Sequence, residues 1–373
     1  MNEAYFCINK NCIFHKKVIR KRKWFIRFGK YKSNIKGNIQ RFRCKKCGKT
    51  FSAQTFRLDY YEKKLLNYND IMSYLSESMS ISGISRLLRV SVETISNRIE
   101  KFSRQVLVYH EYLKGQITLK EDLVADGFES FVKSQYFPNN IHFLGGKDSQ
   151  YLYFLNYVLL KRKGRMTEEQ KDKRNKLYKD IDYPKGSIKK AFSVVLDEFF
   201  KLVKTSDKHI ALYTDMKKDY KTVFDNHDLY NDFKNRISHV EISSRKLRDK
   251  SNDLYTANYL DRETRKDQAN HRRETTCHAR NVCSCLNRLV VYFFHHNYIK
   301  DYRIKNKDYI GISHAEVAGL PKNIIKKVLN KIFENRVFLS LENVKSFALD
   351  LWNKKLITPL KGKTDYIPEY AFM

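Results

Sequence analysis

Residues 80–104 carry apolar side chains at helical rather than strand spacing. The segment reads SISGISRLLRVSVETISNRIEKFSR, and its apolar positions are Ile81, Ile84, Leu87, Leu88, Val90, Val92, Ile95 and Ile99. The pattern predicts two short helices joined by a turn near Arg89–Ser91, with Ser91 capping the second helix. This is the spacing of a helix-turn-helix, and an ordinary helical hairpin is the alternative.

From about residue 118 the pattern changes to short apolar runs that are typical of strands. We expect strands within 122–131, 139–164, 208–220 and 237–244, an amphipathic helix over 187–205 and long helices over 253–296. A charged stretch near 160–186 lacks a strand pattern. Strands followed by a helix, a strand and further helices predict an α/β layer with a mixed sheet.

The chain is strongly basic, because it has 73 Lys and Arg but only 41 Asp and Glu, a net charge of +32. A polyanion would relieve this repulsion, and nucleic acid is the partner that the charge favours. A lysine-rich genome that loads solvated faces with lysine is the plain alternative. Residues 1–50 argue against it, since they carry 16 basic residues and a single acid, Glu3.

Two features of the sequence bear on location. It has no apolar run of about 18 residues, so we expect no membrane span. No apolar run follows the N-terminal residues, so we expect no signal peptide. Its seven cysteines therefore indicate free thiols or a metal site rather than disulfides, and the expected location is the cytoplasm.

Four of the cysteines are spaced for a metal ion. Cys7, Cys12, Cys44 and Cys47 follow the pattern C-x4-C-x31-C-x2-C, and two such pairs present four thiolates to one tetrahedral Zn²⁺. Gly48 suits the turn after the second pair, and the basic and aromatic residues between the pairs are typical of the strands of a zinc ribbon. A redox C-x-x-C pair is the alternative, and His15 could compete as a ligand, although four cysteines already complete the site.

The predicted helix-turn-helix offers candidate DNA contacts near the start of its second helix. Thr94 and Asn97 carry short polar side chains that can reach base edges, while Arg98 and Lys101 can contact phosphate.

Two acids, Asp126 and Asp215, fall at predicted strand ends, where side chains open onto the crevice of an α/β sheet. Carboxylates there can hold Mg²⁺ or Mn²⁺, and two such ions can activate an attacking oxygen and stabilise the leaving one. For either acid alone, the competing interpretation is a turn or cap residue.

A third carboxylate normally completes such a site, and the helical region 254–281 supplies the candidates Asp261, Glu263, Asp267 and Glu274. Asp261 and Glu263 are two residues apart and point roughly 200° from each other on a helix, so only one of them can serve. Arginines in the same region are suited to DNA phosphates: Arg262, Arg265, Arg272, Arg273 and Arg280.

Together these motifs resemble the DDE-type transposases of bacterial insertion sequences that carry an N-terminal zinc ribbon and a helix-turn-helix. The stretches concerned are RCKKCGKTFS, ADGFES, YTDMKKDY and TANYLDRETR. The resemblance implies a ribonuclease-H-like catalytic domain in which Asp126 and Asp215 are the first two catalytic acids. In the third motif the family has a hydrophobic residue, Glu and Arg, so Asp261 would replace the Glu, with Glu263 as second choice.

The resemblance implies a DNA transposase that binds the terminal repeats of its element as an oligomer and carries out strand cleavage and transfer. Zn²⁺ would be structural, and Mg²⁺ or Mn²⁺ would be catalytic at Asp126, Asp215 and Asp261. The expected domains are a zinc ribbon over 1–58, a helix-turn-helix domain over 59–115, a catalytic domain over 116–300 with a basic insertion near 160–186, and a helical extension over 301–373.

Two other functions fit parts of the same pattern. A non-catalytic DNA-binding regulator would explain the charge and the cysteines but leaves the acids without a role. A nuclease would cut DNA strands without joining them.

Overall fold

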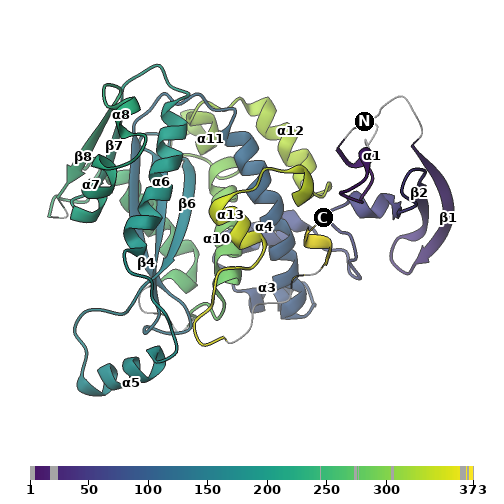
Figure 1. Cartoon of the computed structure of the whole chain (residues 1–373), viewed down its shortest axis with the longest axis horizontal. Coiled ribbons are helices and arrows are strands. Elements are labelled where there is room, and N and C mark those ends of the chain that lie inside the picture. The colour runs from purple at the N-terminus through teal and green to yellow at the C-terminus, as the bar shows by residue number, and fades with distance from the viewer. Residues whose placement is uncertain are drawn as a thin grey trace.

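The computed structural model describes residues 5–16, 24–243, 245–272, 275, 277–303, 306–361, 367 and 369–372. Two sheets organise the chain. The first has three antiparallel strands in the order β1-β2-β3 and lies at one end of the molecule, while the second has five strands and lies at the other (Figure 1). The mixed α/β class predicted from the sequence is therefore confirmed.

The N-terminal lobe is a small sheet wrapped around aromatic side chains. Its elements are α1 (Ile13–Lys16), β1 (Phe25–Ser33), β2 (Gly37–Cys44), β3 (Thr50–Ser52) and η1 (Ala53–Phe56). Trp24 stacks on Phe14 and Phe51, with ring centroids 5.6 and 5.3 Å away. These rings and the buried cysteines form a hydrophobic cluster separate from the main core.

Three helices follow, and they join the main core instead of forming a separate one. They are α2 (Tyr68–Ser76), α3 (Ile81–Leu87) and α4 (Val92–Lys114). α2 and α4 pack against α10 (Val282–Tyr298), and one continuous hydrophobic cluster runs from Leu58 to Leu351. Ser103 of α4 also donates a hydrogen bond to Asn287 of α10, at 2.8 Å. The hydrophobic core thus crosses the expected domain boundary after residue 115.

The five-stranded sheet has the order β6-β5-β4-β7-β8. Its strands are β4 (Leu123–Phe131), β5 (Pro138–Gly146), β6 (Leu152–Leu159), β7 (Ile210–Asp215) and β8 (Ile237–Ile242). β4, β5 and β6 pair antiparallel, whereas β4 with β7 and β7 with β8 pair in parallel. Parallel neighbours need crossovers, and α6 (Ser187–Val203), α7 (Lys218–Asp225) and α8 (Tyr230–Phe233) lie within them.

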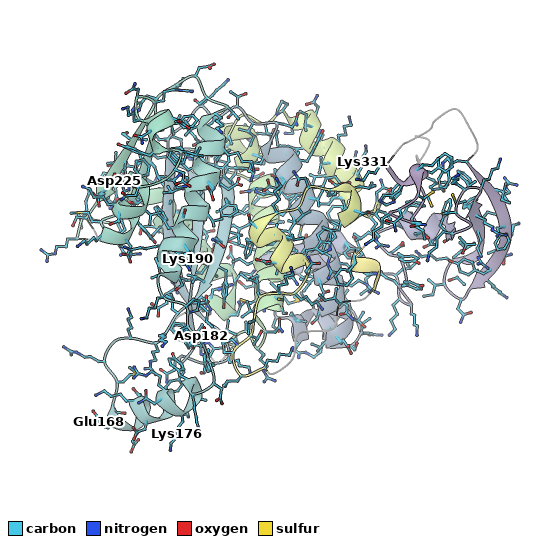
Figure 2. All side chains as sticks on the ribbon, in the orientation of Figure 1. Glu168, Lys176, Asp182, Lys190, Asp225 and Lys331 are labelled. Atoms are coloured by element: carbon cyan, nitrogen blue, oxygen red, sulfur yellow. The ribbon has the colours of Figure 1, made fainter. Side chains whose placement is uncertain are left out.

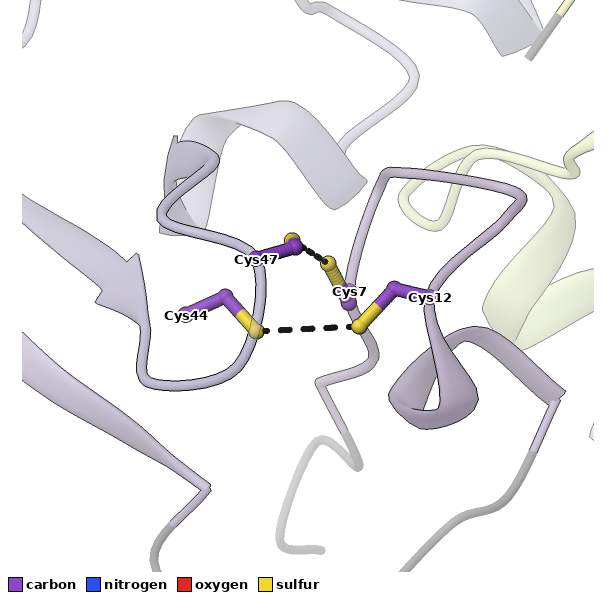
Figure 3. A group of neighbouring side chains, drawn as sticks. All are labelled: Cys7, Cys12, Cys44 and Cys47. Atoms are coloured by element: carbon purple, nitrogen blue, oxygen red, sulfur yellow. Dashed lines mark hydrogen bonds between the residues drawn. The ribbon is translucent and has the colours of Figure 1, made fainter.

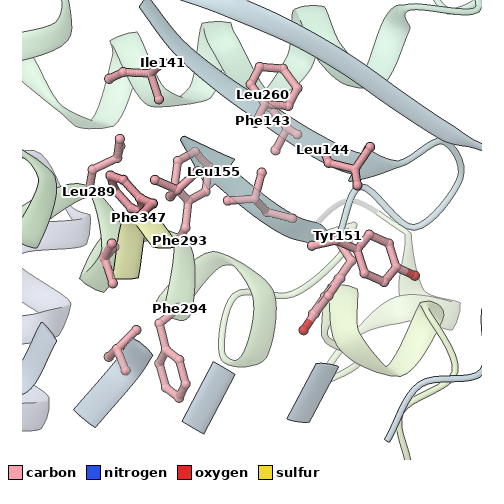
Figure 4. Close-up of a cluster of buried hydrophobic side chains, with 14 of the residues drawn as sticks. Ile141, Phe143, Leu144, Tyr151, Leu155, Leu260, Leu289, Phe293, Phe294 and Phe347 are labelled. Atoms are coloured by element: carbon pink, nitrogen blue, oxygen red, sulfur yellow. The ribbon is translucent and has the colours of Figure 1, made fainter. Parts of the chain in front are cut away.

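Helices cover both faces of this sheet. His142 of β5 faces Phe192 of α6, whereas a side chain at Gly145 would meet Leu260 of α9 (Tyr255–Asp267). Because residues 142 and 145 differ by an odd number, they point to opposite faces of the strand. The α9 face carries a dense apolar layer, shown in Figure 4, in which Phe293 of α10 lies near Leu155 of β6.

A charged insertion separates β6 from α6. It contains α5 (Glu168–Tyr178), none of whose residues is buried, and the labelled Glu168 and Lys176 lie on a segment that projects from the molecule (Figure 2). The Tyr178 hydroxyl donates a hydrogen bond to the Tyr136 carbonyl and accepts one from the Arg162 amide, and these contacts fasten the base of the insertion.

The C-terminal segment joins the two lobes. After η2 (Ala269–His271) and α10, its elements are η3 (Lys307–Tyr309), α11 (His314–Val317), α12 (Lys322–Ile332), η4 (Leu339–Leu341), α13 (Ser346–Trp352) and η5 (Glu369–Phe372). The Leu58 amide donates to the Glu334 carbonyl at 2.7 Å, and the Arg336 amide donates to the Phe56 carbonyl at 2.9 Å. Residues 334–340 thereby attach the N-terminal lobe to the rest of the chain.

Candidate functional site

The four cysteines of the N-terminal lobe converge, and their sulfur atoms all lie within 4.8 Å of one another. The Sγ atoms of Cys7 and Cys47 are 3.4 Å apart, and those of Cys12 and Cys44 are 3.8 Å apart (Figure 3). Zn–S bonds of about 2.3 Å in a tetrahedron require sulfur atoms roughly 3.8 Å apart. The cluster thus has the size and donor set that a structural zinc ion needs.

The local backbone explains how the cysteines meet. The Gly48 amide donates to the Cys44 carbonyl at 3.0 Å, and Gly48 itself has φ +71, a conformation that favours glycine. His15 is not a competing ligand in this structure. Its Nδ1 lies 2.6 Å from the Cys7 carbonyl and its Nε2 lies 2.8 Å from the Ser340 hydroxyl.

The thiols differ in acidity. Burial raises the pKa of Cys7 and Cys12. Burial also acts to raise the pKa of Cys47, but the Lys49 amide and the Cys7 thiol outweigh it and lower that pKa to about 7. Cys47 is also the one exposed member of the cluster, so it is the thiol best placed to ionise first and begin metal binding.

Asp126 and Asp215 come together on the central strands of the larger sheet. β4 and β7 pair in parallel, with Ala125 beside Thr214. The residues that follow them, Asp126 and Asp215, therefore lie side by side on the face covered by α9. Asp215 ends its strand as predicted. Asp126 does not, because β4 continues to Phe131 and pairs with β5 beyond it, so the prediction of a strand end at Asp126 was wrong.

The charges around Asp126 show which acids are its neighbours. Burial raises the pKa of Asp126, and the negative charges of Asp215 and Asp261 add to that increase. The cation of Lys217, whose Nζ lies 3.8 Å from Oδ1, and the Gly127 amide, 2.7 Å from Oδ1, act against it. The carboxylates of Asp215 and Asp261 and the cation of Lys217 are therefore all close enough to Asp126 to affect its pKa.

The two candidate third acids on α9 point in different directions. Asp261 accepts a hydrogen bond from Arg265 Nε at 2.7 Å. Glu263 instead pairs with Lys300 at 2.6 Å and Lys266 at 3.2 Å, and it lines a separate polar cavity of about 900 Å³. The structure brings Asp261, and not Glu263, into the region of Asp126.

The three carboxylates do not form a closed metal site as they stand. Among the described residues, the four cysteines are the one group of three or more His, Cys, Asp or Glu side chains with ligand atoms close enough to share an ion. Lys217 and Arg265 instead pair with Asp126 and Asp261. Lys217 lies two residues after Asp215, and its role as a neighbour of the acids was not foreseen from the sequence.

Two of the arginines that follow Asp261, Arg265 and Arg272, donate hydrogen bonds to backbone carbonyls. Arg265 donates to the carbonyls of His271 and Glu129, each at 3.0 Å. Arg272 lies beyond the end of α9 and donates to the carbonyls of Arg265 and Lys266, each at 3.1 Å. Arg273 and Glu274 lie outside the described residues. The proposed phosphate contacts of Arg265 and Arg272 would have to compete with these bonds.

The helical pair at residues 80–104 has the predicted turn and cap. α3 ends at Leu87, α4 begins at Val92, and the Ser91 hydroxyl accepts a hydrogen bond from the Thr94 amide at 3.2 Å. Asn97 is exposed and Thr94 is partly exposed, so both can reach a ligand. The second helix is not short, since α4 continues through 23 residues to Lys114 and enters the main core.

Arg98 and Lys101 do not lie on that exposed surface, which corrects the expectation that they contact phosphate. Both pair with Glu62, whose side chain is fully buried, at N–O distances of 3.0 and 3.3 Å. Tyr68 donates a further hydrogen bond to Glu62. Burial lowers the pKa of Lys101 to about 8, although the charge of Glu62 acts in the opposite direction. These two cations compensate a buried carboxylate.

We therefore expect Arg98→Ala to reduce stability rather than DNA affinity. The change leaves the buried Glu62 without its closest cation, and breaking a buried ion pair costs about 3–5 kcal/mol. Urea unfolding should show this loss, while the slope of log K for DNA against log salt stays unchanged. The exposed Arg86→Ala is the control for stability. If Arg98→Ala has a normal unfolding midpoint and the slope of log K against log salt falls by about 0.9, Arg98 contacts DNA phosphate and this prediction is wrong.

Two comparisons with known proteins were negative. No model of a protein family matches the sequence, and no curated protein matches it. Within the described part of the chain, none of the helices is both long enough and apolar enough to cross a membrane.

Proposed function

We propose that this protein is a DDE-type DNA transposase that binds the ends of its element and carries out divalent-metal-dependent strand cleavage and strand transfer. The observation that carries the proposal is the placement of Asp126 and Asp215 on adjacent parallel strands, with Asp261 close enough to raise the pKa of Asp126. Acids in that relation suit metal-dependent phosphoryl transfer.

The sheet supports the same proposal at the level of fold. Three consecutive antiparallel strands are followed by two parallel strands with helical crossovers, and this mixed α/β sheet is compatible with the ribonuclease-H-like domain that the proposal requires. Fold alone does not establish activity, so the assignment of function rests on the acids.

In the proposed reaction the carboxylates of Asp126, Asp215 and Asp261 would hold Mg²⁺ or Mn²⁺. These ions would supply Lewis-acid activation of the attacking and leaving oxygens. Water attacks a phosphodiester at the element end, the P–O3′ bond breaks, and a 3′-hydroxyl is released. That hydroxyl then attacks a target phosphodiester, forming a new P–O bond and releasing a target 3′-hydroxyl. Lys217 and Arg265 must give up their ion pairs with Asp126 and Asp261 when the ions bind.

The N-terminal half provides DNA recognition in this scheme. The zinc ribbon and the exposed start of α4, with Thr94 and Asn97, are the proposed contacts with duplex element ends. The net charge of +32 favours binding to a polyanion. Because an element has two ends, we propose that at least two copies of the chain assemble on DNA.

A non-catalytic DNA-binding regulator is the second candidate. The observation in its favour is that Lys217 and Arg265 pair with the acids, and that the three carboxylates are not gathered as a metal site. In that case Asp126 and Asp261 would be structural ion-pair partners.

One assay separates the candidates. The protein is incubated with end-labelled duplexes that tile the DNA flanking its gene, together with a plasmid target and either Mg²⁺ or Mn²⁺. A transposase should nick at one junction, leave a 3′-hydroxyl and join it to the plasmid, whereas a nuclease should cut without joining. Sequence-specific binding with no nicking in either ion would leave the regulator and overturn the proposal.

A further inference from the structure

The three-stranded sheet of the N-terminal lobe (β1, β2 and β3), here called the ribbon, has an outward face that combines exposed aromatic rings with arginines. Side chains alternate along β1 and β2, so Ile26 and its cross-strand partner Arg43 share a face. The guanidinium carbons of Arg41 and Arg43 lie 5.5 and 5.3 Å from the centroid of the Phe28 ring. Phe28 is nevertheless 39% exposed, and Tyr31 is 40% exposed. The face is therefore apolar and cationic at the same positions.

The segment that forms this face carries charge of one sign. Residues 24–58 contain ten Lys and Arg and no Asp or Glu. The nearest acids along the chain are Asp59 and Glu62, and both are neutralised, Asp59 by Lys36 at 2.6 Å and Glu62 by Arg98 at 3.0 Å. Within the described residues 24–63 both carboxylates are therefore ion-paired, so a ligand on this face would meet a positive field.

A groove of about 520 Å³ extends from the same face. It is lined by Tyr31 and Arg41 of the sheet and by Asp59, Tyr61, Glu62 and Lys63. The volume lies within the range of about 300–1,000 Å³ that is typical of small-molecule sites. Tyr61 is 76% exposed and has φ +62, which is uncommon for a residue other than glycine. The backbone at Tyr61 thus presents a large ring at the groove.

We propose that this face, formed by Phe28, Tyr31, Arg41, Arg43 and Tyr61, binds unpaired nucleotides of single-stranded DNA. Bases stack on exposed aromatic rings and on guanidinium planes, and lysine and arginine follow the phosphates. In a duplex the faces of the bases are already stacked on one another, so exposed rings such as Phe28 cannot stack on them and add little to the affinity for duplex DNA. Unpaired DNA is a polyanion with exposed base faces, so it can contact both the aromatic rings and the cations of this face.

The inference rests on the proposed function, because it assigns to the ribbon the single-stranded ends and gaps that strand cleavage and transfer produce. β1 lies at the outer end of the molecule, at the far right of Figure 1, so a strand bound there does not have to pass through the main core.

The test measures fluorescence anisotropy with the full-length, zinc-loaded protein, using labelled oligothymidine and a labelled hairpin duplex. Stacking is worth about 1–3 kcal/mol per base, so Phe28→Ala and Tyr31→Ala should each weaken oligothymidine binding by about fivefold or more. Duplex binding, which depends mainly on phosphate contacts, should change by less than about twofold. Phe28→Trp should retain binding, and Tyr112→Ala, at another exposed tyrosine on α4, should have no effect.

Zinc content checks that each variant keeps the ribbon folded. Parental oligothymidine affinity in zinc-loaded Phe28→Ala and Tyr31→Ala, or an equal loss of duplex binding, would overturn the inference. The proposed function is tested separately, because Asp126→Ala should abolish nicking and leave oligothymidine binding unchanged. If the parent protein never nicks DNA but Phe28 still governs oligothymidine binding, the stacking face stands and the transposase proposal fails.

Discussion

Replacing Cys44 with serine is expected to abolish zinc binding and unfold the ribbon while the rest of the chain stays folded. Structural zinc contributes on the order of 10–16 kcal/mol in small domains, more than a cluster as small as that around Trp24 and Phe51 can replace. The main core forms a separate cluster, so it should survive. Metal analysis should find one zinc per parent chain and none in the variant.

The exposed Cys277 provides the matched control, since Cys277→Ser changes a thiol outside the cluster and should keep its zinc. Circular dichroism should show that the helices are retained in both variants. Because residues 334–340 pack against the ribbon, some loosening of the C-terminal segment should accompany the loss of zinc. Full zinc occupancy in Cys44→Ser would exclude the four-cysteine site.

Signals that lie close together in the sequence predicted the structure well. The spacing within each of the two cysteine pairs, the glycine at position 48 and the cap at Ser91 depend on residues only a few positions apart, and the structure has all three. The mixed α/β arrangement followed from the order of the strand and helix patterns. Such features are fixed by local backbone geometry, which periodicity and residue type reflect directly.

Features that depend on distant partners were not predictable in the same way. Arg98 and Lys101 have the appearance of phosphate ligands only until Glu62 is placed beside them from a loop before α2. Nothing in the pattern indicated that residues 334–340 would pack against the ribbon. Asp126 was expected at a strand end because the apolar run stops there, yet pairing with β5 extends the strand past it.

The acids of the candidate site were predictable only in part. Helix geometry alone required Asp261 and Glu263 to diverge, and their partners Arg265 and Lys300 do lie on different sides of α9. The sequence could not say which of the two faces the sheet. In the structure the charge of Asp261 acts on Asp126. Mutation can test whether Asp261 or Glu263 is the third acid.

We expect Asp126→Ala, Asp215→Ala and Asp261→Ala each to eliminate metal-dependent nicking, and Glu263→Ala to keep it. A metal ion stabilises the transition state by several kcal/mol, and at about 1.4 kcal/mol per tenfold the loss of a ligand should slow cleavage roughly a thousandfold. Glu263 interacts with Lys300 and Lys266 instead, so its removal should affect stability more than cleavage. The measurement is Mg²⁺- or Mn²⁺-dependent nicking of a labelled element-end duplex.

DNA binding separates loss of chemistry from loss of structure in these variants. Each of the three inactive variants should bind the duplex as well as the parent or slightly better, since removing a carboxylate reduces repulsion of phosphate. Asp126→Asn is the matched control, because it keeps an oxygen that can accept from the Gly127 amide but lacks the charge that holds a metal ion. It should be as inactive as Asp126→Ala and as stable as the parent. If Glu263→Ala is inactive and Asp261→Ala cuts normally, the third acid is Glu263. If Asp126→Ala and Asp215→Ala both cut like the parent, the proposed metal-dependent reaction at these acids is wrong.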